Sequence, residues 1–147
     1  MNKRHQQNGF TLIEMIMVIV IMGALSVVAI AKFDRDSFEA EAVINEVIQA
    51  IRYAQSKSMS NTGANNFQIA IAANGYSVTQ NGVAILHPVS GVSGYSKTWS
   101  DVTLSPAMTI VFDGYGDPGL GSNTTFTVTK GSDSRSFTVE AITGFSR

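Results

Sequence analysis

Apolar residues follow three different patterns along the chain, and each pattern predicts a different element. Residues 10–31 form an almost unbroken apolar run whose one formal charge is Glu14. In residues 32–61 the apolar positions recur at steps of three and four, and from residue 65 onward they alternate with polar ones. These patterns predict, in turn, a helix that is apolar on all sides, an amphipathic helix and half-buried strands.

The first run is long enough to cross a membrane. About 22 residues of helix rise roughly 33 Å, enough for the hydrocarbon core of a bilayer. Residues 1–9 are basic through Lys3 and Arg4 and contain no acid, so they are expected to stay in the cytoplasm. A secretory signal peptide ending at residues 29–31, "AIA", is one alternative. A plain anchor is another, although Glu14 would cost about 2.5–3.5 kcal/mol if it were charged at the bilayer centre.

The amphipathic segment is expected to continue the first run as one helix. Residues 32–61 contain no proline or glycine, and Gly63 follows where a helix commonly stops. Residues 10–61 as one helix would extend roughly 78 Å. The second half carries a single apolar stripe, which predicts a face packed on a domain; it consists of Ile44, Val47, Ile48, Ile51 and Ala54.

The remainder of the chain reads as an antiparallel sheet. Asn74-Gly75 and Asn81-Gly82 are hairpin-turn signals, and residues 88–101 are expected to form an exposed loop. Strands are expected at residues 67–71, 76–78, 83–86, 102–104, 108–112, 124–129 and 136–140. A sheet with one apolar face needs a cover, and the helical stripe supplies it. The predicted fold class is α+β: a long N-terminal helix packed on an antiparallel meander sheet.

Composition narrows the function by exclusion. The chain has 147 residues, no cysteine and a formal net charge of −1. The missing cysteines exclude disulfides, cysteine-ligated metals and a thiol nucleophile. The charge balance does not favour nucleic-acid binding.

The sequence around the start of the apolar run, Gly9-Phe10-Thr11-Leu12-Ile13-Glu14, follows a basic leader. It resembles the processing site of type IV pilins and pseudopilins. The resemblance implies that a prepilin peptidase cuts between Gly9 and Phe10 and methylates the new amine of Phe10. It also implies that Glu14 pairs with the N-terminal amine of a neighbouring subunit during assembly. Residues 1–9 are then a leader, 10–31 a transmembrane and filament-core helix, 32–62 an amphipathic helix, and 63–147 a globular β domain.

Three further stretches resemble H-type minor pseudopilins and FimT-like minor pilins: "IRYAQSKSMSNTG", "VFDGYGDPG" and "FTVEAITGFSR". The resemblance implies a minor type IV pilin that builds or initiates a surface pilus for adhesion, with the mannose-sensitive haemagglutinin pilus as the preferred system. The alternatives are a minor pseudopilin of type II secretion and a DNA-binding minor pilin for DNA uptake. The implied partners are other pilin subunits, the prepilin peptidase and the inner-membrane assembly platform. Before assembly the chain would cross the inner membrane once, with its C-terminal domain in the periplasm. Afterwards it would lie in a surface pilus or a periplasmic pseudopilus.

No residue pattern predicts catalysis or a cofactor. Residues 114–119 match G-x-G-x-x-G, but a strand pattern follows where a phosphate-binding loop needs a helix. Asp113 and Asp117 are weak candidates for calcium, although the EF-hand pattern fails. His87 is expected to be a loop residue without a catalytic role. Tyr95, Lys97 and Trp99 would suit DNA or sugar binding, but Trp99 is expected to pack over the rim of the domain.

Overall fold

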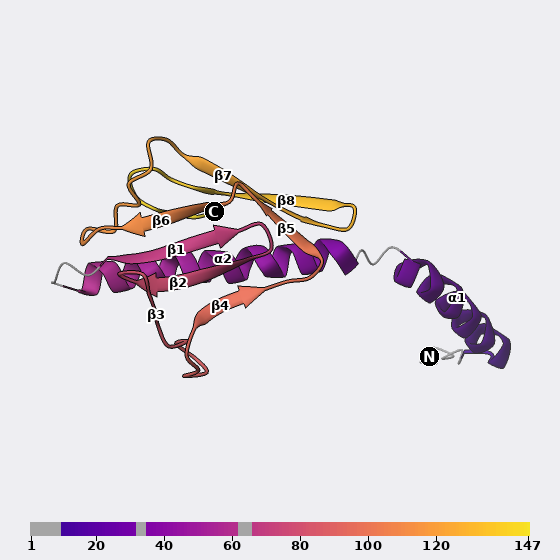
Figure 1. Ribbon diagram of the computed structural model, residues 1–147. Coiled ribbons are helices and arrows are strands. Elements are labelled where there is room, and N and C mark those ends of the chain that lie inside the picture. Colours follow the sequence, from indigo (N-terminus) through magenta and orange to yellow (C-terminus); the bar gives the residue numbers. More distant parts are fainter. Residues whose placement is uncertain (1–9, 32–34, 62–65) are drawn as a thin grey trace, which may run out of the picture. The chain divides into compact units, whose positions relative to one another are not determined.

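The computed structural model describes residues 10–31, 35–61 and 66–147 (Figure 1). The chain forms two compact units, Met1–Asp34 and Arg35–Arg147. The expected leader, including Gly9, lies outside the described residues. So do the expected join at residues 32–34 and the helix stop at Gly63.

The first unit contains helix α1, Leu12–Ala31. Its large apolar side chains between Leu12 and Leu25 are exposed, with exposed fractions of 48–79%. Within residues 10–31, the Ser26 hydroxyl donates a hydrogen bond to the Met22 carbonyl oxygen at 2.7 Å. Among the residues that the structure describes, no helix is both long enough and apolar enough to qualify as a membrane span.

The second unit is built around helix α2, Arg35–Ser60. All five residues of the predicted stripe are buried, and Ala40, Val43 and Ala50 extend it. Because burial of one Val or Ile side chain contributes about 1.5–3 kcal/mol, this face accounts for much of the attraction between helix and sheets. The prediction that the stripe covers the β domain is confirmed, since α2 contacts β1, β7 and β8.

Two antiparallel sheets face this helix (Figure 1). The larger has the order β3-β2-β1-β6, and β4 also pairs with β2. The smaller has the order β5-β7-β8. The strands are β1 Phe67–Ala72, β2 Gly75–Gln80, β3 Val83–Ala84, β4 Tyr95–Thr98, β5 Val102–Ser105, β6 Met108–Phe112, β7 Thr124–Lys130 and β8 Asp133–Val139.

The α+β class is confirmed, but the expectation of a single meander is wrong. After β4 the chain enters the smaller sheet as β5, and it returns to the larger sheet as β6, next to β1. Alternation along a strand specifies which side chains face the core, but it does not specify the neighbouring strand. The buried pairs Phe126/Val128 and Phe137/Val139 therefore follow the prediction although the sheet assignment does not.

The expected loop at residues 88–101 contains a strand. Tyr95–Thr98 forms β4 and pairs with β2 in the register Val78↔Tyr95 to Gly75↔Thr98. Tyr95 is 7% exposed, so this strand contributes one large side chain to the core. The surrounding serines, glycines and lysine concealed it, because a strand with one buried residue has no clear apolar period.

The hairpin turn at Asn81-Gly82 is confirmed. Their φ angles are 50° and 80°, and Gln80 pairs with Val83 across the two-residue loop. Positive φ at both central positions is the requirement of a type I′ turn, for which Asn-Gly is the preferred pair. The Asn81 side chain also accepts a hydrogen bond from the Asn66 backbone N–H at 3.0 Å.

Side chains of α2 donate hydrogen bonds to the loop after β6 and to the last residues of the chain. Gln55 Nε2 donates to the carbonyl oxygens of Gly116 and Thr143, at 2.9 and 2.6 Å. Arg52 donates to the Ser146 carbonyl oxygen at 3.0 Å. One face of α2 thereby holds both the loop after β6 and the tail after β8.

Candidate functional site

The start of α1 is organised by Thr11 and Glu14. The Glu14 carboxylate accepts hydrogen bonds from the Thr11 backbone N–H and from the Thr11 hydroxyl, both at 3.0 Å. The Glu14 backbone N–H donates to the Thr11 hydroxyl oxygen at 3.3 Å. Together these bonds form a capping box, in which two side chains satisfy backbone donors that the first helical turn leaves free.

The capping box gives Glu14 a role within its own chain that the sequence interpretation missed. The signal was present, because "TLIE" has the S/T-x-x-E spacing that marks a helix start. Phe10, the expected first residue after processing, lies just before the box and is 85% exposed. The acid that interrupts the apolar run is therefore held at the N-terminal end of α1.

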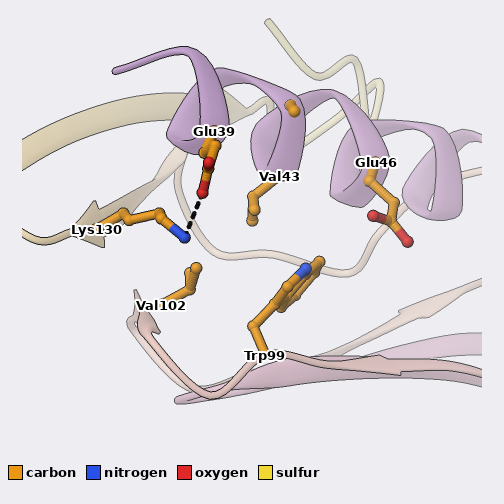
Figure 2. Close-up of a pocket in the computed structure, with 7 residues that line it drawn as sticks. Glu39, Val43, Glu46, Trp99, Val102 and Lys130 are labelled. Atoms are coloured by element: carbon orange, nitrogen blue, oxygen red, sulfur yellow. Dashed lines mark ion pairs between the residues drawn. The ribbon is translucent and has the colours of Figure 1, made fainter. Parts of the chain in front are cut away.

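A second feature is a groove between the first half of α2 and the strands, which we call the Trp99 groove (Figure 2). Its volume is about 210 Å³, and it opens to solvent. Figure 2 shows Val43 and Glu46 projecting from α2 toward Trp99. The groove is lined by Glu39, Ala42, Val43, Glu46, Trp99, Val102 and Lys130.

One end of the groove is closed by a three-residue ion-pair network. Lys130 Nζ lies 2.5 Å from Glu39 Oε2 and 2.6 Å from Asp101 Oδ2. The hydrogen bonds that Lys130 donates, first to Asp101 and then to Glu39, raise the pKa of Lys130. The bond from Lys130 lowers the pKa of Asp101 below its usual value. The Lys130 charge is thus already matched by two carboxylates.

The other end of the groove is aromatic and acidic. The Tyr76 hydroxyl donates to Glu46 Oε1 at 3.3 Å, and the Tyr76 ring lies 5.9 Å from those of Tyr95 and Trp99. Burial, and then the nearby charge of Glu46, raise the pKa of Tyr76 far above its usual value of 10. Tyr76 therefore remains a neutral donor at physiological pH and leaves the negative charge on Glu46 uncompensated.

The two candidate calcium ligands are engaged in the turn after β6. Asp113 Oδ1 accepts hydrogen bonds from the backbone N–H groups of Tyr115 and Asp117, at 2.8 and 2.9 Å. Asp117 Oδ1 accepts one from Gly119 at 2.8 Å. Such bonds are typical of aspartates that shape turns. Within residues 10–31, 35–61 and 66–147, no three acidic, histidine or cysteine side chains are grouped as metal ligands would be.

Of the remaining candidates, Tyr95 and Lys97 lie in β4, whereas His87 and Trp99 lie in the segments that flank it. His87 Nδ1 accepts hydrogen bonds from the backbone N–H groups of Val89 and Ser90, at 3.2 and 3.3 Å. Tyr95 is buried and cannot stack on a base or sugar, whereas Lys97 is exposed. Trp99 packs against the core at the rim of the domain, as predicted.

Comparison with known families identifies the chain. A model described as prokaryotic N-terminal methylation motif matches residues 4–30, and a model described as type II transport protein GspH matches residues 43–143. The second match covers more than half of the 147 residues. The chain belongs to the GspH family. No curated protein and no solved structure matches the chain.

The GspH match covers α2 from Val43 onward and every strand of the described residues. It places the chain among the minor pseudopilins of type II secretion, within the type IV pilin superfamily. These are structural, non-enzymatic subunits that are processed in the manner of pilins. Membership implies other pilins, the prepilin peptidase and the secretion machinery as partners, and an inner-membrane anchor before processing. The matches support the secretion alternative better than the adhesive pilus that was predicted first.

Proposed function

We propose that this chain is a minor pseudopilin that assembles into the periplasmic pseudopilus of a type II secretion system. The observation that carries the proposal is the GspH match over residues 43–143, joined to a methylation motif over residues 4–30. An adhesive pilus would require a different machine, and neither match points to one. The function is assembly, so the chain needs contact surfaces and not a catalytic centre.

In this proposal residues 10–31 hold the chain in the inner membrane and later enter the filament core. The support is the exposure of the large apolar side chains of α1 between Leu12 and Leu25, which in water would be unfavourable over so large a surface. Both lipid and the packed helices of a filament would cover such a surface. The basic leader would stay on the cytoplasmic side until the peptidase removes it.

We assign two successive tasks to Glu14. Before assembly its carboxylate caps α1 through Thr11. In the filament the same carboxylate would face the methylated amine of Phe10 from a neighbouring subunit. A charge moved out of water is costly unless an opposite charge accompanies it, so the pair would favour one axial register.

Processing is tested on the mature chain isolated from cells that contain the prepilin peptidase. Mass spectrometry should find a chain that begins at Phe10 and is heavier by one methyl group. Gly9→Val should leave the leader in place, because the peptidase acts after a glycine in the family that this site resembles. A wild-type chain that begins at Lys32 would instead show cleavage by signal peptidase and end the pseudopilin proposal.

Two variants separate the tasks of Glu14. Glu14→Gln keeps the capping box, since glutamine also serves at this position, but it removes the charge. Glu14→Ala removes both. We expect normal cleavage of both variants, and at least about tenfold less of each in sheared or affinity-purified pseudopili. Normal incorporation of Glu14→Gln would show that capping alone matters and that the pairing role is wrong.

The choice of machine is tested by deleting the gene and restoring it on a plasmid. Loss of an exported enzyme from the culture medium, with unchanged surface attachment, is the expected result. Normal secretion combined with lost attachment would favour the adhesive pilus.

A further inference from the structure

We propose that the Trp99 groove receives a lysine or arginine side chain from a neighbouring protein subunit. The identity of the neighbour as a sister pseudopilin rests on the proposed function. The preference of the groove for a cation is independent of that function, because it follows from the residues that line the groove.

Charge is the first argument. Lys130 already contacts two carboxylates, those of Glu39 and Asp101. Glu46 takes part in none of the ion pairs found among the described residues, and its one hydrogen-bond donor there is the neutral Tyr76 hydroxyl. A carboxylate has about four acceptor positions, so Glu46 keeps both a negative charge and room for further donors.

The chemistry of the walls is the second argument. Val43 and Val102 form an apolar centre, and the indole of Trp99 lies beside Glu46 (Figure 2). Long basic side chains place their methylene groups on apolar surface and their charged heads in a polar setting. Tryptophan is the strongest of the aromatic partners for such a head, and a carboxylate adds a charge-assisted hydrogen bond. The groove offers these three contacts in sequence along its length.

Size is the third argument. A volume of about 210 Å³ falls below the roughly 300–1,000 Å³ of typical small-molecule sites. The groove is also open on one side, so it suits a side chain presented by a surface that covers it. Of the two basic side chains, arginine is a common anchor at protein interfaces.

The chain contains one tryptophan, so its fluorescence reports directly on the groove. The full chain, held in a zwitterionic detergent at low salt, is titrated with acetyl-arginine amide or acetyl-lysine amide. Acetyl-leucine amide and acetyl-glutamate amide serve as the matched uncharged and acidic probes. We expect a saturable change in Trp99 emission with both cationic probes, in the millimolar range. The uncharged and acidic probes should bind at least about tenfold more weakly.

Glu46→Gln tests the assignment of the cation to this carboxylate. The substitution keeps the shape of the side chain and an oxygen for the Tyr76 hydroxyl, but it removes the charge. We expect the affinity for acetyl-arginine amide to fall about tenfold. Asp133→Asn, which removes an acid from β8 outside the groove, should leave it unchanged. Circular dichroism is used to check that both variants are folded.

Three results would overturn the proposal: no saturable response of the wild type, equal binding of the leucine probe, or unchanged affinity of Glu46→Gln. None of these bears on secretion, which the gene deletion measures separately. If the groove binds the cationic probes but deletion of the gene leaves secretion normal, the cation site would be supported and the claim that its partner is a sister pseudopilin would be rejected.

Discussion

The buried hydroxyl group of Ser58 connects three elements of the second unit. Ser58 is 1% exposed and lies near the end of α2. Its hydroxyl donates to the Phe112 carbonyl oxygen and accepts from the Phe67 backbone N–H, both at 3.0 Å. The end of one helix is thereby joined to the start of β1 and the end of β6. Ser58 follows Ala54, the last residue of the predicted stripe, by four residues and so lies on the same face of α2.

Ser58→Ala should lower the free energy of unfolding by about 2–3 kcal/mol. The variant leaves a buried N–H and a buried carbonyl oxygen without a partner, and the desolvation of such groups is then uncompensated. Urea unfolding measures the change. Ser60→Ala is the matched control, because that hydroxyl is exposed and should contribute no more than about 0.5 kcal/mol. Equal effects of the two variants would contradict this role for Ser58.

At the scale of elements, β4 depends on a close approach of two backbones. Gly75 starts β2 opposite Thr98, and a Cβ atom placed on it would lie 2.2 Å from the Lys97 carbonyl oxygen. The Trp99 N–H donates to the Asn74 carbonyl oxygen at 2.8 Å, directly beside this contact. The turn between β1 and β2 is formed by Ala73 and Asn74, one residue before the predicted Asn74-Gly75 pair. Gly75 instead allows β4 to pair beside the start of β2.

Gly75→Ala should separate β4 from β2. Because the clash is with backbone, the expected loss of stability is about 1–3 kcal/mol. Trp99 emission should shift to longer wavelength as its packing loosens. Gly121→Ala serves as the control, since no heavy atom within 4 Å would meet its Cβ. If both variants melted and fluoresced alike, the proposed dependence of β4 on Gly75 would be wrong.

At the scale of the second unit, Lys130 joins segments that are distant in sequence. It ends β7, and it contacts Glu39 on α2 and Asp101, which lies just before β5. Exposed ion pairs contribute little when isolated, whereas networks contribute more. This network ties the helix to the smaller sheet and bounds the Trp99 groove.

The contribution of Asp101 should depend on pH. Its pKa is lowered by the hydrogen bond from Lys130. Its stabilising effect is therefore present above the ordinary carboxylate pKa, and it is lost as pH falls from that value through the lowered pKa of the folded protein. Asp101→Asn should lower Tm at pH 7, and its difference from wild type should begin to shrink below about pH 5 and continue to shrink as pH falls past 3.8, the usual pKa of this carboxyl group. Thermal unfolding followed by circular dichroism measures this.

Asp133→Asn is the control for this prediction. Asp133 pairs with Arg135, two residues away on the same strand, so it joins no distant segments. A smaller change in Tm at pH 7 is expected. A difference for Asp101→Asn that persisted unchanged at pH 3 would refute the linkage.

The sequence by itself determined the features that depend on near neighbours in the chain. The stripe from Ile44 to Ala54, the alternating faces of β1, β7 and β8, and the Asn81-Gly82 turn follow from periodicity and φ preference. The motif at residues 9–14 indicated the pilin superfamily in the same way, because its residues are contiguous. The capping box of Thr11 and Glu14 was equally legible there and was missed.

Only the tertiary structure decided which distant segments meet. The division into two sheets, the insertion of β4, and the meeting of Trp99, Glu46 and Lys130 join residues from separate parts of the chain. Each strand carries the same alternating signal, so many pairings would satisfy it, and the complete packing of the core selects one. The Trp99 groove forms only when these segments are packed in this way. No single stretch of the sequence therefore predicts it.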